Sequence, residues 1–387
     1  MIYITGDTHG GFQRFTTKNF PQQRQMSRND YAIITGDFGG VWDDSPRETY
    51  WLDWLEGKPI APLYLEVSPS GMCNHRCRFC GMDYVGYPQR RLPGELFRAR
   101  LAEMGEAGVR AIMFAGEGEP FMNREMEGIA VAAREAGIDV AFTTNGVLLA
   151  PHRAEKVLPV ASWIKVSCNA GTAGTYAHVH GTSKDDFDVM WRNMEAACAR
   201  RAQSGAPCVI GFQLLALPEN RAEAAALAAR ARDIGADYLV IKPYSISPKS
   251  LHDEYRDLHY GACDDLLAAL ELSTDAFRVI FRQETMQRRE QPRLTYARCH
   301  ALPFWGYVDS GATLWGCLRH IGEEAFNFGN LADGSFSDLL NHPNRLKKLK
   351  EWSESGEIGD CHVACRMDAV NAYLWELRHP SAHVNFI

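Results

Sequence analysis

Three cysteines in one short run are the residues of this chain best suited to chemistry. Cys73, Cys77 and Cys80 lie in the stretch Cys-Asn-His-Arg-Cys-Arg-Phe-Cys. Thiolates hold iron–sulfur clusters, usually four per cluster, so three ligands would leave one iron open to a small molecule. Zinc is the alternative, with His75 or a distant cysteine as its fourth ligand, and plain buried thiols are another.

The spacing CxxxCxxC, with the aromatic Phe79 before its last cysteine, resembles the radical S-adenosylmethionine (radical SAM) superfamily. The resemblance implies that Cys73, Cys77 and Cys80 hold a [4Fe-4S] cluster whose open iron binds SAM, with Phe79 beside the cofactor. It also implies that one electron, from a donor such as flavodoxin or ferredoxin, cleaves SAM to a 5′-deoxyadenosyl radical. This radical would abstract hydrogen from a substrate.

The elements that must position these cysteines follow from the pattern after about residue 60. Short β-branched runs alternate with helical periods there, which is typical of βα units on a parallel sheet. Six such strands indicate an α/β fold, a partial (β/α)6 TIM-like barrel with its chemistry at the carboxyl ends of the strands. The predicted strands are 63–67, 110–114, 139–142, 163–166, 208–212 and 238–241, and the predicted helices are 94–107, 124–136, 185–202 and 221–234.

Each of the next three predicted strands leads into a polar or glycine-rich motif. Ala115-Gly116-Glu117-Gly118-Glu119-Pro120 resembles the Gly-Gly-Glu-Pro segment of the superfamily, with Glu117 in place of its first glycine. The resemblance implies that Gly116, Gly118 and Glu119 hold the methionyl amine of SAM. Glycines let backbone approach a ligand, and a carboxylate can bind an ammonium group.

The third and fourth strands end in Thr-Thr-Asn-Gly and Ser-Cys-Asn-Ala-Gly. The first resembles the superfamily's Thr-Asn-Gly element and makes Asn145 a candidate cofactor contact. The second resembles Ser-x-Asp-Gly, which implies that Ser167 reaches the ribose or carboxylate of SAM, with Asn169 replacing the usual Asp. Other polar groups keep structural interpretations that are at least as good, namely Lys242, Tyr244, Tyr176 and His180.

Four more cysteines, Cys299, Cys317, Cys361 and Cys365, follow the predicted barrel. The first two flank a predicted hairpin that turns at 309–311 and would bring them together. The pattern resembles the SPASM or twitch extension of radical SAM enzymes, which implies one auxiliary iron–sulfur cluster, with [4Fe-4S] favoured. A zinc site with four thiolates is the alternative. The remaining cysteines read as small buried apolar residues: Cys168, Cys198, Cys208 and Cys263.

The first 59 residues do not fit this pattern. Two predicted strands there end in Gly6-Asp7-Thr8-His9 and Gly36-Asp37. Asp7, His9 and Asp37 have the spacing of a two-metal phosphoesterase, and the segment resembles the opening βαβ portion of calcineurin-like metallophosphoesterases. Three ligands are too few to hold two ions, so we expect a truncated fragment with little or no phosphatase activity.

The composition limits the classes of function. The chain has 387 residues, is 46% hydrophobic and carries a net charge of −7 without a long basic run, which argues against nucleic acid as a partner. No apolar run is long enough for a membrane span, and the N-terminus carries no secretion signal pattern. Eleven cysteines without such a signal favour metal ligation in a reducing cytoplasm over disulfides.

We therefore predict three parts: a metallophosphoesterase-like fragment at 1–59, a radical SAM barrel at 60–285 and an auxiliary cluster domain at 286–387. The predicted function is a radical SAM oxidation of a sugar-like or aminocyclitol-like small molecule. A peptide-modifying radical SAM/SPASM enzyme is the alternative within the superfamily. A zinc-binding non-catalytic protein or a metallophosphoesterase is the alternative from another class. The sequence names no catalytic residue beyond the cofactor ligands.

Overall fold

The computed structural model describes residues 2–5, 21, 31–34, 53, 57–245, 247–261, 263–290, 294–355, 358, 361 and 365–380. Its chain divides into two compact units, Met1–Ile60 and Ala61–Ile387. In the first unit, β1 (Ile2–Thr5) and β2 (Tyr31–Ile34) pair in parallel. The candidate metal ligands of this unit, Asp7, His9 and Asp37, lie outside the described residues.

The second unit is built on one sheet of ten strands in the order β12-β11-β10-β3-β4-β5-β6-β7-β8-β9. Every neighbouring pair from β10 through β3 to β9 is parallel, which confirms the α/β fold and the barrel-type sheet. The strands are β3 (Tyr64–Val67), β4 (Ala111–Phe114), β5 (Asp139–Thr144), β6 (Ala161–Ser167), β7 (Val209–Ala216), β8 (Tyr238–Pro243), β9 (Arg278–Phe281), β10 (Trp305–Val308), β11 (Thr313–Trp315) and β12 (Asn327–Asn330).

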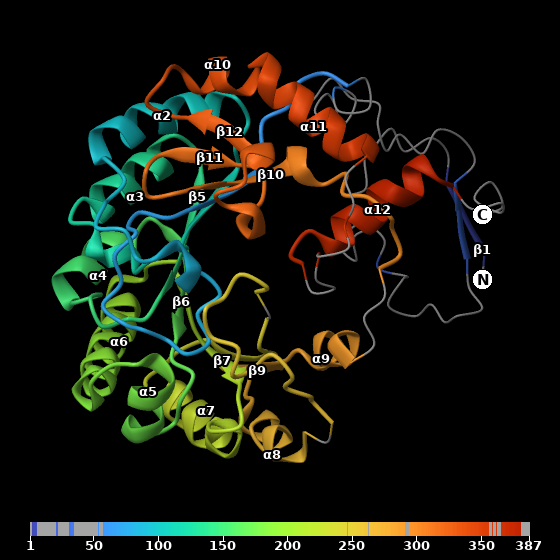
Figure 1. Cartoon of the computed structure of the whole chain (residues 1–387). Helices are drawn as coiled ribbons and strands as arrows, with labels where there is room; N and C mark the ends of the chain where they lie inside the picture. Colours follow the sequence, from blue (N-terminus) through green and yellow to red (C-terminus); the bar gives the residue numbers. More distant parts are fainter. Residues whose placement is uncertain are drawn as a thin grey trace. The chain divides into compact units, whose positions relative to one another are not determined.

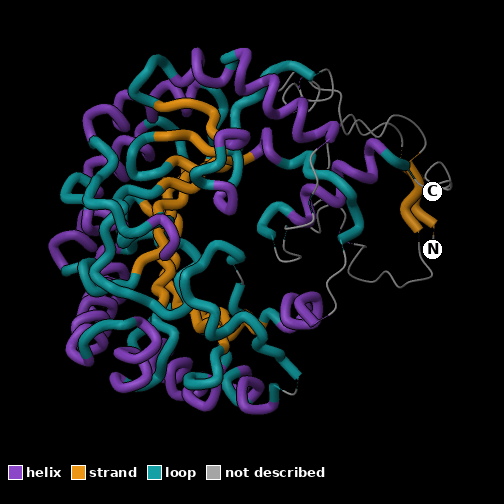
Figure 2. The backbone as a smooth tube through the Cα atoms, viewed as in Figure 1, coloured by secondary structure: helices purple, strands orange, loops and turns teal. Residues whose placement is uncertain are grey.

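Helices follow the parallel strands and cover the outer face of the curved sheet, as Figures 1 and 2 show. All four helices predicted from the sequence are present. The helices are α2 (Gly94–Glu106), α3 (Met126–Glu135), α4 (Pro151–Val157), α5 (Ala173–His180), α6 (Lys184–Ser204), α7 (Ala224–Asp233), α8 (Asp264–Leu267), α9 (Gln283–Glu290), α10 (Phe336–Leu340), α11 (Pro343–Ser355) and α12 (Asp368–Arg378). Among the described residues, no helix has the length and apolarity needed to cross a membrane.

The alternation of side chains along β3 explains how the sheet has two different faces. Leu65 and Val67 are fully buried in the large apolar core that the helices cover. Because successive strand residues point to opposite faces, Tyr64 and Glu66 lie on the inner face. Tyr64 packs there against a small apolar cluster that includes Met113. The outer face therefore supplies the apolar core, and the inner face carries polar groups.

The C-terminal strands continue the barrel sheet. The predicted hairpin is present, with β10 and β11 antiparallel and Asp309 to Ala312 forming its turn. β10 also pairs in parallel with β3, from Trp305 opposite Tyr64 to Val308 opposite Val67. An unpaired β3 would expose a row of backbone donors and acceptors, and β10 satisfies them. The turn of the hairpin thus lies near the strand end that leads into the cysteine loop.

Candidate cluster and cofactor site

The loop with Cys73, Cys77 and Cys80 follows the carboxyl end of β3 and is fixed to the end of α5. The backbone N–H of Arg76 donates to the carbonyl of His180 (3.0 Å), and that of Arg78 donates to Val179 (3.0 Å). Gly181 makes this approach possible, because a Cβ there would lie 2.2 Å from the Arg76 carbonyl oxygen. Its φ of +56° is also a conformation that favours glycine.

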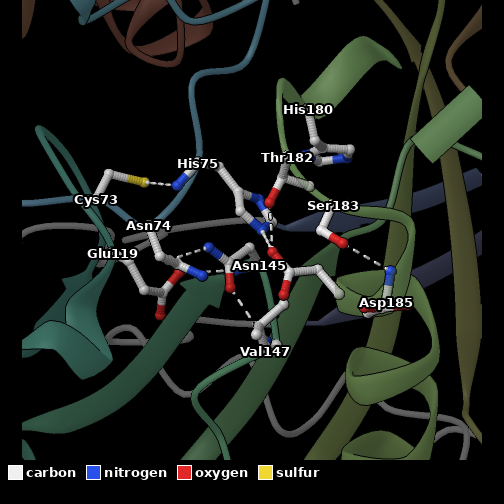
Figure 3. A network of polar contacts seen from close by, with 12 residues as sticks. Cys73, Asn74, His75, Glu119, Asn145, Val147, His180, Thr182, Ser183 and Asp185 are labelled. Carbon is white, nitrogen blue, oxygen red and sulfur yellow. Dashed lines mark hydrogen bonds and ion pairs between the residues drawn. The ribbon is translucent and has the colours of Figure 1, made fainter. Parts of the chain in front are cut away.

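Two histidines lie beside the cysteines, His75 within the loop and His180 at the end of α5. The Nδ1 atom of His180 is 3.3 Å from Cys77 Sγ, and its Nε2 is 2.6 Å from the carbonyl oxygen of Cys168. His75 places its Nε2 3.2 Å from an oxygen of Asp186, and its backbone N–H points to Cys73 Sγ at 3.5 Å (Figure 3). The His180 ring is thus fixed at both nitrogens, whereas the His75 ring is fixed at Nε2 alone.

The three thiols interact with one another in a desolvated setting. Burial raises the pKa of the Cys73 thiol to about 12, and the charges of Glu119 and Cys80 add to the rise. Burial also raises the pKa of Cys77 well above its usual range, with Cys80 and Cys73 adding. Without a metal these thiols stay protonated, and a bound cation would offset the cost of deprotonation. This donor set fits a metal cluster held by three thiolates.

Among the described residues, His75, Cys77 and His180 form a group whose donor atoms all lie within 4.8 Å of one another. This is the arrangement that the zinc alternative would need. The Nε2 atoms of both histidines face protein oxygens, at Asp186 and at the Cys168 carbonyl. The Nδ1 atom of His75 is buried without a hydrogen-bond partner, and that of His180 faces Cys77 Sγ. A metal-bound histidine usually has its second nitrogen on such an oxygen, so this group also suits the zinc alternative.

Glu119 lies at the neighbouring strand end, fully enclosed by protein. Its carboxylate accepts hydrogen bonds from the Thr144 hydroxyl (2.5 Å) and from the backbone N–H groups of Asn145 (2.8 Å) and Phe121 (3.2 Å). Burial raises its pKa, and these three donors act against that rise. Two carboxylate oxygens offer about four acceptor positions, so one remains for a further donor such as an ammonium group.

Asn145 joins the Thr-Asn-Gly element to the cysteine loop. Its side-chain amide donates to the Asn74 side chain at 2.8 Å, and its oxygen accepts from the backbone N–H of Val147 at 3.0 Å (Figure 3). The motifs after β3, β4 and β5 are therefore bonded to one another through Asn74, Asn145 and Glu119. The sequence predicted their adjacency from the parallel sheet, whereas the bonds between them depend on side-chain geometry.

The two motif glycines are required by close packing between loops. A Cβ on Gly118 would lie 2.1 Å from the Met72 carbonyl oxygen, in the cysteine loop. A Cβ on Gly116, which has φ +116°, would lie 2.3 Å from the Tyr307 hydroxyl on β10. Their contact with SAM remains a prediction, and the structure gives both a second reason to be glycine.

The other predicted cofactor residues have clear places in the fold. Phe79 packs at the edge of an apolar cluster that contains Val179 and Tyr244, and its ring meets the His180 ring edge-on at 5.1 Å. Ser167 ends β6 and is half-buried opposite Gln213 of β7. Tyr244 is buried by packing, in line with its structural interpretation.

Asp83 is a buried residue just after the cysteine loop that the sequence reasoning missed. Its carboxylate accepts from the Ser250 hydroxyl (3.1 Å) and from the backbone N–H groups of Leu251 (3.0 Å) and His252 (3.2 Å). It therefore holds the segment after β8 beside the cysteine loop. No local pattern in the sequence marks this role, because all its partners lie more than 160 residues away along the chain.

The four C-terminal cysteines lie near enough to affect one another's pKa. Burial raises the pKa of Cys317 to about 12, and the charges of Cys365, Cys299 and Cys361 each add to the rise. Burial also raises the pKa of Cys299 to about 12, and the charges of Cys361 and Cys365 add to that rise. Four thiols that influence one another in this way are a suitable donor set for a metal centre.

The cysteines outside both groups differ among themselves. Cys168, Cys198 and Cys208 are buried, as predicted for small apolar residues. Cys263 is only partly buried, because it lies in the loop before the short helix α8. Its sulfur approaches the Tyr260 carbonyl oxygen at 3.6 Å.

Comparison with known sequences identifies the central part of the chain. The radical SAM superfamily profile matches residues 67–231. A GTP 3′,8-cyclase from Heliobacterium modesticaldum is 32% identical over 142 residues, which are 35% of this chain and 42% of that protein. The chain spans less than half the length of the curated relatives that it matches.

Solved structures agree at the level of the fold. SuiB of Streptococcus suis, bound to S-adenosylmethionine, superposes with a TM-score of 0.58 at 14% identity, covering 87% of this chain and 78% of SuiB. Native anSMEcpe with bound AdoMet gives a TM-score of 0.52 at 13% identity, covering 75% and 84% of the two chains. The sequence matches indicate an enzyme of the radical SAM type, with residues 67–231 forming a radical SAM superfamily domain. The solved structures add that the fold is shared.

Proposed function

We propose that this chain cleaves S-adenosylmethionine reductively and uses the resulting radical to abstract hydrogen from a substrate. The observation that carries the proposal is the meeting of the cysteine loop with Glu119 and Asn145 at adjoining strand ends. When bound there, a [4Fe-4S] cluster and SAM would supply the 5′-deoxyadenosyl radical. The protein's part is to orient the cofactors and exclude water.

The residues of the site suit distinct tasks. Cys73, Cys77 and Cys80 hold the cluster, and His180 orients Cys77 from behind. Glu119 keeps an acceptor position for the ammonium group of SAM in a desolvated place, where a charge-assisted hydrogen bond is strong. The remaining assignments, Gly116, Gly118, Asn145, Ser167 and Phe79 beside the cofactor, rest on the resemblance of their motifs.

The second group of thiols supports an oxidation. We propose that Cys299, Cys317, Cys361 and Cys365 hold one auxiliary iron–sulfur cluster of the SPASM or twitch type. A cluster there could take up the electron that a substrate radical releases. The proposed partners are a small-molecule substrate, of the sugar or aminocyclitol kind, and a one-electron donor such as flavodoxin or ferredoxin. A peptide substrate is the second candidate.

Anaerobic reconstitution tests the proposal. The purified chain would be loaded with iron and sulfide, and metal, sulfide and 5′-deoxyadenosine would then be measured with dithionite and SAM present. About eight irons per chain are expected for two four-iron clusters, and about four for a single one. A chain that binds only zinc and releases no 5′-deoxyadenosine would overturn the proposal.

Matched cysteine variants separate the two centres. Cys77→Ala should remove about half of the iron and all SAM cleavage, whereas Cys317→Ala should remove about half of the iron and spare uncoupled cleavage. Cys198→Ala is the control, because this thiol is buried on α6 in the apolar core and belongs to neither group of candidate ligands. Iron loss in the Cys198→Ala control would mean that the lower iron content of the variants reflects misfolding and not the loss of a ligand.

A further inference from the structure

The inner face of the sheet carries an ion pair between a buried carboxylate and a partly exposed guanidinium from distant parts of the chain. Glu66 projects from β3, and its side chain is 5% exposed. Arg366, just before α12, places Nη1 2.6 Å from a Glu66 oxygen and 2.9 Å from the Tyr64 hydroxyl. Its guanidinium also lies over the Trp305 ring at 5.7 Å. One negative charge on this face is thus already neutralised.

Two lysines add to this face without a counter-charge. Lys165 lies between the buried Ile164 and Val166 on β6, so its side chain points to the inner face, with Nζ 5.6 Å from the Trp163 ring. Lys242 likewise follows the buried Ile241 on β8, so its side chain also points to the inner face. Neither ammonium group has an ion pair or hydrogen bond to any residue that the structure describes.

The lysines and the ion pair form one electrostatic group. Burial, with the charges of Lys165 and Arg366 adding and that of Glu66 opposing, lowers the pKa of Lys242 to about 7. Burial likewise lowers the pKa of Lys165 to about 8, with Arg366 and the more exposed Arg282 adding. The cluster therefore has several cations around a single carboxylate.

We propose that this cationic inner face binds an oxyanion group, a carboxylate or a phosphate, of the substrate. The inference rests on the proposed function for its setting and names the chemical class of the substrate. Desolvated cations without a counter-ion are costly, and an oxyanion would offset that cost through charge-assisted hydrogen bonds. A guanidinium and two ammonium groups provide enough donors for all oxygens of such a group.

The positions of Lys165 and Glu66 along their strands suit substrate binding. Lys165 is two residues before Ser167 on the same face of β6, and Glu66 is two residues before the loop segment that begins at Ser68. Two residues of a strand span about 7 Å. The bound oxyanion would therefore lie about one layer of side chains below the strand ends that carry the cysteine loop, and the reacting carbon would face the cofactors.

Calorimetry on the reconstituted protein tests this inference with two probes, inorganic phosphate and succinate. The wild-type chain should bind at least one of them at one site per chain, and Lys165→Met and Lys242→Met should each weaken that binding at least about tenfold. Lys242→Arg, which keeps the charge, should retain it. Lys184→Met is the control, because Lys184 is exposed at the start of α6.

The outcomes separate the inference from the proposed function. Binding of phosphate alone assigns a phosphate ester, and binding of succinate alone assigns a carboxylate. Binding that neither lysine variant changes, or no saturation below about 10 mM, overturns the inference. SAM cleavage is measured in parallel in every variant. Its retention shows that the variant is folded, and its absence in the wild type would overturn the proposed function whatever the probes do.

Discussion

Glu117 accepts a hydrogen bond from the backbone N–H of Ser310 at 3.0 Å. This bond joins the motif loop after β4 to the turn between β10 and β11. Arg90 reinforces it, with Nη2 3.4 Å from Glu117 and 3.3 Å from Asp309. Glu117 stands where the superfamily motif has its first glycine. In this chain the departure links the predicted SAM-binding loop to the C-terminal hairpin.

Replacing Glu117 by Ala should lower the free energy of unfolding by about 1–3 kcal/mol, because the Ser310 N–H would stay buried without an acceptor. Glu117→Gln keeps an acceptor oxygen and should cost less. Urea unfolding of the two variants measures the difference. Glu135→Ala, at the exposed end of α3, is the control. If Glu117→Ala were as stable as the wild type, the hydrogen bond between Glu117 and Ser310 would contribute nothing to the free energy of unfolding.

Gly181→Ala should reduce cluster occupancy, because its Cβ would lie 2.2 Å from the Arg76 carbonyl oxygen and push the cysteine loop away. Gly205→Ala is a close control. Gly205 also ends a helix with positive φ, at +67°, but a Cβ there meets nothing within 4 Å. Both variants carry the same kind of backbone strain. Iron per chain after reconstitution should therefore fall for Gly181→Ala only, and an equal fall in both would refute the steric argument.

The sequence predicted those features that depend on local pattern. The strands β3 to β8 follow from short β-branched runs, and the cysteine loop and Glu119 follow from motifs at strand ends. Adjacent parallel strands then bring these motifs to one edge of the sheet. This is why the core of the candidate site could be located from sequence, together with the radical SAM superfamily that residues 67–231 match.

Contacts between distant segments could not be predicted in the same way. Arg366 reaches Tyr64 across 302 positions of the chain, and Ser310 reaches Glu117 across 193. Nothing near Arg366 in the sequence indicates that the chain returns to β3. The pairing of β10 with β3 could not be predicted either, because two parallel strands are not joined by a short turn that the sequence would mark. The sequence marked Lys242 only as a polar strand end with a structural interpretation at least as good, and no motif marked Lys165.

The pair of Arg366 and Glu66 makes a thermodynamic cycle possible. Arg366→Met alone should destabilise the fold by about 1–3 kcal/mol, because it leaves the Glu66 carboxylate buried without its ion-pair partner. Glu66→Gln in the same chain should restore part of that loss. Urea unfolding of the two single variants and the double variant gives the coupling energy. Strict additivity of the two single effects would show that the ion pair contributes no coupling.

Lys242 should make the stability of the fold depend on pH in a defined window. Its folded pKa is about 7, below the ordinary value of about 10.4 for an unfolded lysine. Between these values the unfolded chain binds more protons, so the free energy of unfolding should rise with pH through this group. Below about pH 7 both states are charged and the full cost of the buried charge is present.

Lys242→Met removes this titration, leaving Lys165, Arg366, Arg282 and Glu66 as the charged groups on the inner face. The variant should be more stable than the wild type at pH 6, and its advantage should shrink as the pH rises towards 9.5. Urea unfolding of both proteins at the two pH values measures the change. A difference that stays constant with pH would mean that Lys242 keeps an ordinary pKa and a hydrated ammonium group, and the cationic face would then lack the desolvation that favours an oxyanion.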